Sequence, residues 1–289
     1  MSGRENCAPD LARIVAAFAC ERQTAHGLAP LARWFGKGEA SFEESLAQLV
    51  WQRCAYGLAH RLTDEKLPFL PLKGWDVSLR LYPDPALRPM SDLDLWIAPE
   101  QLPRLATIMA ELGYRLHKRG GYDNTWRHGR HGCTVETHFA LHEPGRAGFA
   151  PGAMWERAEA WSWQGLALRR LRADDLWVYL AWHFAKHRPW QRRLLWLVDL
   201  HLLSDRLDWP QAEEAARRWR VLRAAEVALW ELHRLGLATP AAAPPGRLSP
   251  LFRTPIDAVG MRGRLLPRLY SLWLVEGWRQ RGRYLWTRH

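Results

Sequence analysis

Apolar residues follow different patterns in successive parts of the chain, which divide it into a helical beginning, a mixed middle and a helical end. Over residues 11–20 and 42–62 they recur every three or four positions, as on one face of a helix. The spacing predicts two helices, and we assign residues 1–63 to an N-terminal helical region.

Short apolar segments replace the helical spacing between residues 64 and 145. Pro68 and Pro71 lie in the first of them and predict an edge strand or an irregular start, because proline cannot donate to a β ladder. The predicted strands cover residues 67–72, 92–98, 114–118 and 133–141, the predicted helices cover 75–81 and 99–112, and the Gly-rich residues 120–132 form a hairpin or loop. This order predicts a small mixed-sheet α/β core of the α+β kind.

Helical spacing returns after residue 153, so residues 146–289 form a predicted C-terminal helical region. The predicted helices cover residues 174–187, 191–205, 210–219, 222–235 and 267–286, and the Ala- and Pro-rich residues 239–255 form a linker. The fold class is therefore an α/β core flanked by helices on both sides.

Composition leaves the type of partner open. The formal charge is +11, and 36 of the 41 basic residues are Arg. This excess has two explanations, a polyanionic partner such as RNA or an Arg-rich composition that reflects GC-rich coding. No apolar run is long enough to span a bilayer, and the polar first residues do not form a signal peptide. The four Cys form no C-x-x-C pair, so neither a zinc site nor a disulfide framework is expected, and a cytoplasmic location fits.

Two carboxylates on one predicted strand are the first sign of chemistry. Asp92 and Asp94 alternate with apolar residues, so both side chains project from one face, about 6 to 7 Å apart. At an effective dielectric near 20 they repel by about 2 to 3 kcal/mol, and a divalent cation between them reverses that sign. Oxygen ligands of this kind suit Mg²⁺, with Mn²⁺ as the alternative. Replacing either Asp by Asn should abolish activity without lowering the metal-free melting temperature.

Three further groups complete the constellation. Glu136, on the polar face of a later strand, is the candidate third carboxylate for metal binding. Lys73-Gly74 lies where a strand turns into a helix, a place where backbone N–H groups and a cation can hold phosphates. His138 shares the face of Glu136, and three roles stay open for it: orienting an acceptor, transferring a proton, or packing.

These segments together resemble one known family. The matching stretches are Leu72-Lys73-Gly74, Leu81-Tyr82-Pro83-Asp84-Pro85, the run from Arg88 to Leu95, Val135-Glu136-Thr137-His138, and the later Asp174-Asp175-Leu176, His183 to His187 and Leu195 to Leu200. They resemble the uncharacterised nucleotidyltransferase family of the polymerase-β-like superfamily over roughly residues 45 to 205.

The resemblance implies transfer of a nucleoside monophosphate from an NTP to an acceptor hydroxyl, with release of pyrophosphate. It implies Asp92, Asp94 and Glu136 as catalytic metal ligands. It further implies that the nucleotide is bound by Lys73, Gly74, Arg88, Ser91, His183 and His187. Arg88 has two further explanations, ion pairs with Asp84 or with Asp92, and the pair His183–His187 also fits simple helix packing. Trp75 departs from the family, which often has Gly or Ser there, and predicts a crowded phosphate turn.

The acceptor is not identified by the sequence. A small molecule, a peptide or protein, and RNA are all compatible with it. The alternatives to a general nucleotidyltransferase are a toxin-like enzyme that modifies transfer RNA and a non-catalytic nucleotide- or RNA-binding module on the same fold. Intact acids at three positions count against the non-catalytic module.

Overall fold

A computed structural model describes residues 42–143, 145–187, 194–237, 265–277 and 279–281. These residues belong to two compact units. One, here called the sheet unit, contains residues 42–143 and 149–172; the other, the helical unit, contains the remaining described residues. The predicted helix at residues 11–20 and the linker at 239–255 lie outside the described residues.

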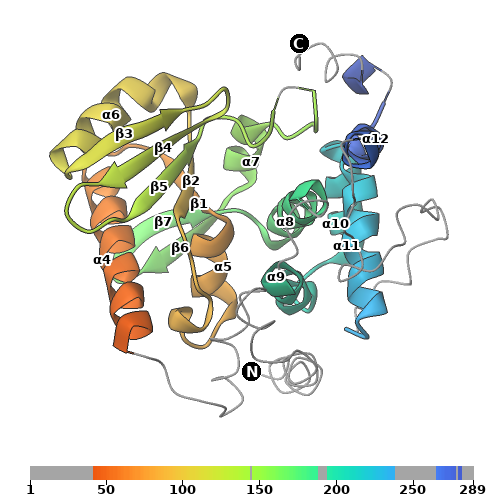
Figure 1. Ribbon diagram of the computed structural model, residues 1–289, viewed down its shortest axis with the longest axis horizontal. Coiled ribbons are helices and arrows are strands. Elements are labelled where there is room, and N and C mark those ends of the chain that lie inside the picture. Colours follow the sequence, from red (N-terminus) through yellow and green to blue (C-terminus); the bar gives the residue numbers. More distant parts are fainter. Residues whose placement is uncertain (1–41, 144, 188–193, 238–264, 278, 282–289) are drawn as a thin grey trace. The chain divides into compact units, whose positions relative to one another are not determined.

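The sheet unit is built on five strands in the order β1-β2-β5-β4-β3 (Figure 1). Strands β2 and β5 are parallel, and the other neighbours are antiparallel. The elements are α4 (Phe42–Asp64), β1 (Phe69–Leu72), α5 (Lys73–Leu81), η1 (Pro85–Leu87), β2 (Leu93–Ile97), η2 (Pro99–Gln101), α6 (Leu102–Glu111), β3 (Tyr114–Arg119), β4 (Asp123–His128), β5 (Thr134–His138), α7 (Pro151–Arg157), β6 (Glu159–Trp163) and β7 (Leu166–Arg170). The predicted mixed-sheet α/β fold is confirmed, and β1 with its Pro71 is an edge strand, as expected.

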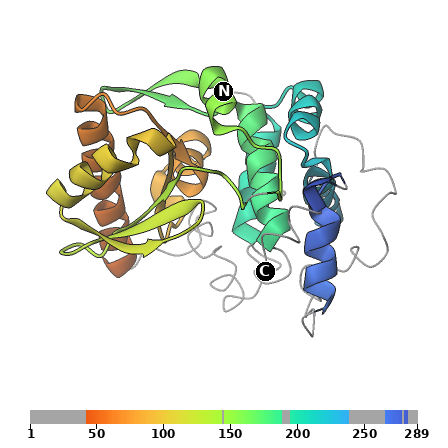
Figure 2. The ribbon, with the colours of Figure 1, turned by 90° about the horizontal axis from the view of Figure 1, so that it is seen from above.

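Period-two alternation decides which side chains of the central strands enter the core. Leu93, Leu95 and Val135 are fully buried in one cluster with residues of α4 and α6. Figure 2 shows these two helices close together, and Arg61 of α4 forms an ion pair with Glu111 at the end of α6. The residues between these core positions therefore project from the opposite face of the sheet.

Residues 120–132, expected as a hairpin or loop, contain the strand β4, which pairs antiparallel with both β3 and β5, so the hairpin alternative is confirmed. Another part of the sheet unit differs from the sequence prediction. Residues 159–170, expected in a helical region, form the hairpin β6–β7. Its turn, Gln164-Gly165, has positive φ at both residues (50° and 83°), the conformation of a two-residue hairpin turn. The two strands, EAWSW and LALRR, are short and show no regular alternation of apolar and polar residues, so the helical spacing of the following segments dominated the prediction.

A disulfide joins α4 to the segment before β5, contrary to the expectation of no disulfide. The Sγ atoms of Cys54 and Cys133 are bonded, across 79 residues of sequence. Spacing along the chain could not reveal this pair, because tertiary packing of α4 beside the sheet brings the two residues together.

The helical unit packs around α8, whose side chains are mostly buried. Its described elements are α8 (Ala173–His187), α9 (Leu194–Ser204), α10 (Trp209–Arg218), α11 (Leu222–Arg234) and α12 (Leu265–Leu274). Trp177, Trp182 and Phe184 of α8 are at most 1% exposed. Helices lie at the five predicted places, the first four with bounds within three residues of the prediction. The last helix, predicted over residues 267–286, begins at Leu265 and ends at Leu274, before Gly277 with its positive φ of 83°. None of the described helices is both long and apolar enough to pass through a membrane.

Candidate active site

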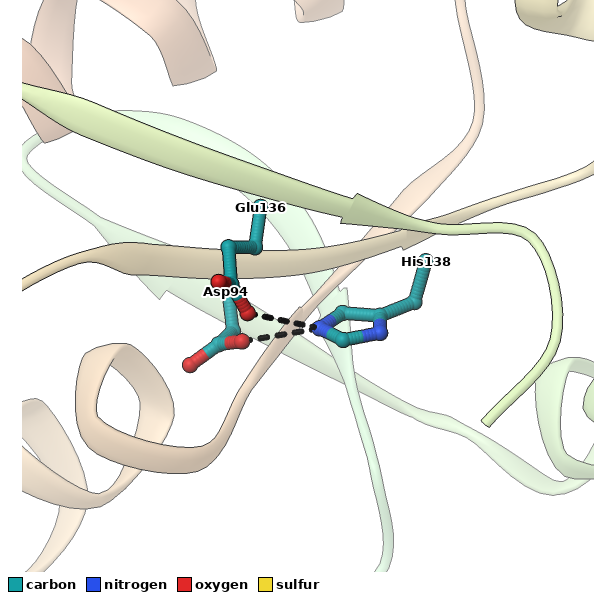
Figure 3. A group of neighbouring side chains, drawn as sticks. All are labelled: Asp94, Glu136 and His138. Carbon is teal, nitrogen blue, oxygen red and sulfur yellow. Dashed lines mark hydrogen bonds and ion pairs between the residues drawn. The ribbon is translucent and has the colours of Figure 1, made fainter. Parts of the chain in front are cut away.

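Asp94 and Glu136 lie side by side on the face of the sheet opposite the core. Parallel pairing of β2 and β5 sets Asp94 level with Glu136 and Trp96 level with His138. The side chains of Asp94, Glu136 and His138 point toward one another (Figure 3). Their candidate ligand atoms all lie within 4.8 Å of one another. The strand register thus brings Asp94 next to Glu136 and His138, which are more than forty residues away from it in the sequence.

Lys73 supplies a positive charge to this group. Its Nζ donates to Asp94 Oδ1 at 2.7 Å and lies 4.0 Å from Glu136 Oε2 and 3.4 Å from His138 Nε2. Lys73 is the first residue of α5 and has a φ of +45°, a conformation that side-chain-bearing residues rarely adopt. Backbone strain of this kind is found where the surrounding structure needs a particular side-chain direction, and here that direction is toward Asp94.

Asp92 precedes β2 in a bend, so the strand begins one residue later than predicted. Ser91 Oγ donates to Asp92 Oδ1 at 3.0 Å. Burial, followed by the negative charge of Asp94, raises the pKa of Asp92 above its usual range. Asp92 is not part of the group formed by Asp94, Glu136 and His138, whose candidate ligand atoms lie within 4.8 Å of one another, but its carboxylate interacts electrostatically with that of Asp94.

The pKa values of Asp94 and Glu136 are shifted in opposite directions. Burial alone would raise the pKa of Asp94, but Lys73 and the hydrogen bond from His138 hold it well below its usual range. Burial and the charge of Asp94 raise the pKa of Glu136 to about 7. Burial, and then Lys73, lower the pKa of His138. Such separated pKa values are typical of sites that bind cations or move protons.

The turn after β1 brings Arg88 against Gly74. A Cβ at Gly74 would collide with the Arg88 guanidinium, so glycine permits this close approach and a larger residue would displace the Arg88 side chain. The Arg88 side chain is almost fully buried, and its Nη1 donates to Pro89 O at 3.3 Å. The N-cap of α5, Leu72, provides no side-chain cap for the N–H groups of the first turn.

Trp75 does not crowd this turn, contrary to the sequence expectation. It is 1% exposed and packs into the core, where its ring stacks on Phe69 and meets Trp163 edge-on. The departure from Gly or Ser is accommodated because the side chain leaves the turn on the core side. Trp163 belongs to the hairpin β6–β7, which the sequence prediction had missed.

His183 and His187 belong to the helical unit. Their rings lie 4.7 Å apart, and both contact Trp196 of α9. The contacts with Trp196 agree with the explanation of this pair as helix packing. The predicted contact of the two histidines with a nucleotide stays a prediction.

The donor set fits a divalent cation. Two adjacent carboxylates, a third carboxyl at Asp92 and an elevated pKa at Glu136 describe a site whose negative charges repel one another. The Lys73 ammonium, within 4.0 Å of both Asp94 and Glu136, already shows that a cation is stabilised there. Oxygen ligands of this type suit Mg²⁺ or Mn²⁺.

Comparison with protein families identifies the chain. Residues 12–236 match the model of an uncharacterised nucleotidyltransferase family. The chain belongs to this family. It is therefore a nucleotidyltransferase, in agreement with the resemblance carried by the Lys-Gly and Asp-x-Asp segments.

Comparison with solved structures gives matches of low identity and low TM-score. The solution structure of the antibiotic-resistance factor ANT(2'')-Ia is 17% identical, with a TM-score of 0.42, over 66% of this chain and 97% of that one. The crystal structure of ANT(2'')-Ia with adenylyl-2''-tobramycin is 16% identical, with a TM-score of 0.42, over 61% and 97%. An antigenic nucleotidyltransferase-like protein from Paracoccidioides brasiliensis is 13% identical, with a TM-score of 0.37, over 65% and 92%. No curated protein matches the chain.

Proposed function

We propose that this nucleotidyltransferase moves a nucleoside monophosphate from an NTP to an acceptor hydroxyl, with release of pyrophosphate, and that it requires Mg²⁺ or Mn²⁺. The observation that carries the proposal is the adjacency of Asp94 and Glu136 beside Lys73 at the start of α5. This adjacency puts two carboxylates that can bind a cation next to the helix N-terminus and the lysine that can bind phosphate.

Asp92, Asp94 and Glu136 would hold the divalent ion. When bound, the ion neutralises phosphate charge and polarises the reacting oxygens. Ser91 fixes the orientation of Asp92 through the hydrogen bond at 3.0 Å. This arrangement is supported by the repulsion among the three acids, which a cation relieves.

The phosphates would lie against the first turn of α5. The N–H groups there have no side-chain cap from Leu72, so they are available to an anion, and the helix dipole favours negative charge. Lys73 and the Arg88 guanidinium, which packs against Gly74, supply positive charge at this turn. His183 and His187 are proposed as additional nucleotide contacts on the strength of the family resemblance.

The reaction is an in-line displacement at the α-phosphorus. The acceptor hydroxyl oxygen forms a bond to that phosphorus as the bond to the bridging oxygen of the β-phosphate breaks, and pyrophosphate leaves with the bonding electron pair. The hydroxyl proton passes to a carboxylate, for which Glu136 is the candidate because its pKa lies near neutrality. The remaining contribution of the chain is positioning and charge stabilisation.

The test uses each of the four NTPs labelled at the α-phosphorus, with Mg²⁺ or Mn²⁺, and three acceptor pools: transfer RNA, peptides or proteins, and small hydroxylated metabolites. Labelled product and released pyrophosphate are expected from the wild type and from Asp64→Asn, a control that changes an exposed carboxylate of α4. Asp94→Asn should give none. Equal turnover by Asp94→Asn and the wild type would contradict the proposal, and NTP binding without turnover in all pools would favour a non-catalytic module.

A further inference from the structure

His138 is a buried residue of the site to which neither the family match nor the metal-binding role of the acids assigns a function. It is the last residue of β5, and its side chain is 4% exposed. Its Nε2 lies 2.8 Å from Oδ1 of Asp94, the shortest contact it makes among the described residues (Figure 3). A buried imidazole this close to one oxygen of Asp94 acts on the orientation of that carboxylate.

The direction of the hydrogen bond follows from the partner. An ionised carboxylate oxygen only accepts hydrogen bonds, so Nε2 of His138 carries the hydrogen and donates. The other ring nitrogen, Nδ1, is buried and has no hydrogen-bond partner among the described residues. With the hydrogen on Nε2, the unpartnered Nδ1 of the neutral ring carries only a lone pair, so no buried N–H group of this ring is left without an acceptor.

The same atoms argue against His138 as a metal ligand, although its Nε2 lies among the candidate ligand atoms. A neutral histidine that bound a metal through Nε2 would carry its hydrogen on Nδ1. Metal-bound histidines almost always donate that hydrogen to a carboxylate, carbonyl or water, and His138 has no such acceptor among the described residues. Coordination would therefore leave a buried donor unpaired.

Asp94 thus receives two donors on one oxygen. Lys73 Nζ at 2.7 Å and His138 Nε2 at 2.8 Å both bind Oδ1, and no donor reaches Oδ2 within the described part of the chain. The terminal torsion of an aspartate is broad and two-fold, so a carboxylate without such contacts can rotate. The two bonds hold the carboxylate plane and leave Oδ2 as the oxygen directed to a cation.

We infer that His138 is a positioning residue that fixes Asp94 for metal binding by donating from Nε2 to Oδ1. The inference rests on the proposed function, in that it takes Asp94 as a metal ligand. Lys73 does not fix Asp94 alone, because its long side chain is flexible and is proposed above to bind phosphate as well. Partners that orient a metal ligand in this way typically change metal affinity by about 10- to 100-fold when removed.

The experiment is a Mn²⁺ titration of the full chain, with free Mn²⁺ followed by its electron paramagnetic resonance signal. His138→Ala is expected to bind Mn²⁺ about 10- to 100-fold more weakly than the wild type. His138→Gln is expected to recover most of the affinity, because its amide nitrogen can donate to Oδ1 from a similar position. His117→Gln, a matched change at an exposed position of β3, should bind like the wild type.

Pulsed resonance on the wild-type Mn²⁺ complex separates positioning from ligation. The expected spectrum shows no nitrogen coupling from a coordinated imidazole. A nitrogen coupling that disappears in His138→Gln would overturn the inference. Wild-type Mn²⁺ affinity in His138→Ala would also overturn it. The same holds if His138→Gln binds Mn²⁺ as weakly as His138→Ala while both variants melt like the wild type. If His138→Ala does not fold, the comparison of His138→Gln with the wild type decides through its affinity and its nitrogen coupling.

Failure of the proposed function gives a different result. Mn²⁺ binding that depends on His138 in a protein that turns over none of the four NTPs would refute the transferase proposal and leave the positioning role standing. Turnover of an NTP with Mn²⁺ affinity unaffected by His138→Ala would do the reverse.

Discussion

Asp92 and Asp94 should respond in opposite ways to the same substitution in the metal-free protein. The sequence, which shows only two neighbouring acids, predicts that neutralising either one relieves repulsion. The structure separates them, because Asp94 is buried against Lys73 and His138, whereas Asp92 accepts a hydrogen bond from Ser91. We expect Asp94→Asn to destabilise the sheet unit and Asp92→Asn to leave it unchanged or slightly more stable.

The magnitudes follow from the distances. At an effective dielectric near 20, the Lys73–Asp94 pair at 2.7 Å attracts by about 6 kcal/mol before desolvation is counted. Because desolvation offsets much of this attraction, and since Asn still offers an oxygen, the loss in Asp94→Asn is about 3 kcal/mol, the low end for a broken buried pair. For Asp92→Asn the relieved repulsion of about 2 to 3 kcal/mol is partly offset by the lost attraction to Lys73 and Arg88, which leaves a gain of about 1 kcal/mol.

Thermal melting in a chelating buffer near pH 8 measures both effects. The expected shifts are a fall of about 6 to 12 °C for Asp94→Asn and a rise of about 2 to 4 °C for Asp92→Asn. Asp64→Asn on α4, where the carboxylate is exposed, serves as the control for the chemical change itself. Shifts of the same sign and size in the two site variants would refute the reasoning, because they would mean that Lys73 does not distinguish the two acids.

Further predictions concern pH, the disulfide, a buried ion pair and RNA. Because the pKa of Glu136 is raised from 4.5 to about 7, the folded state binds this proton more tightly than the unfolded state. The free energy of unfolding of the metal-free protein should therefore fall as the pH rises from about 4.5 to about 7, while Mn²⁺ affinity rises over the same range. In denaturant titrations, Glu136→Gln should flatten this dependence of stability on pH. Reduction of the Cys54–Cys133 disulfide should lower the free energy of unfolding by about 2 to 4 kcal/mol, measured with and without dithiothreitol, and Cys54→Ser/Cys133→Ser should be insensitive to the reductant. Asp76→Ala should cost about 3 to 5 kcal/mol, since it leaves the buried Arg80 without its two-point partner, and unchanged urea unfolding would count against that pairing. If the acceptor is RNA, binding of a fluorescent transfer RNA pool should weaken by more than about tenfold between 50 and 200 mM salt, whereas weak, salt-insensitive binding would exclude it.

Much of the fold and the acids of the site could be predicted from local sequence patterns. Alternation placed Asp94 and Glu136 on polar strand faces, and the Lys73-Gly74 turn was expected at a strand-to-helix junction. These features are local, because strand periodicity and turn chemistry act over only a few residues. The hairpin β6–β7 was missed because its strands are only five residues long and show no regular alternation of apolar and polar residues.

The sequence by itself determined the residue types of the site and the faces of the strands on which they lie. Only the tertiary structure decided that β2 runs parallel to β5 with Asp94 beside Glu136, that Lys73 and His138 bind the same oxygen of Asp94, that Trp75 leaves the phosphate turn for the core, and that Cys54 meets Cys133. Strand order, register and side-chain contacts depend on packing between segments far apart in the chain. Periodicity fixes the face of a strand from which a side chain projects. Which residue the side chain then contacts depends on how the strands and helices of the sheet unit pack around its core.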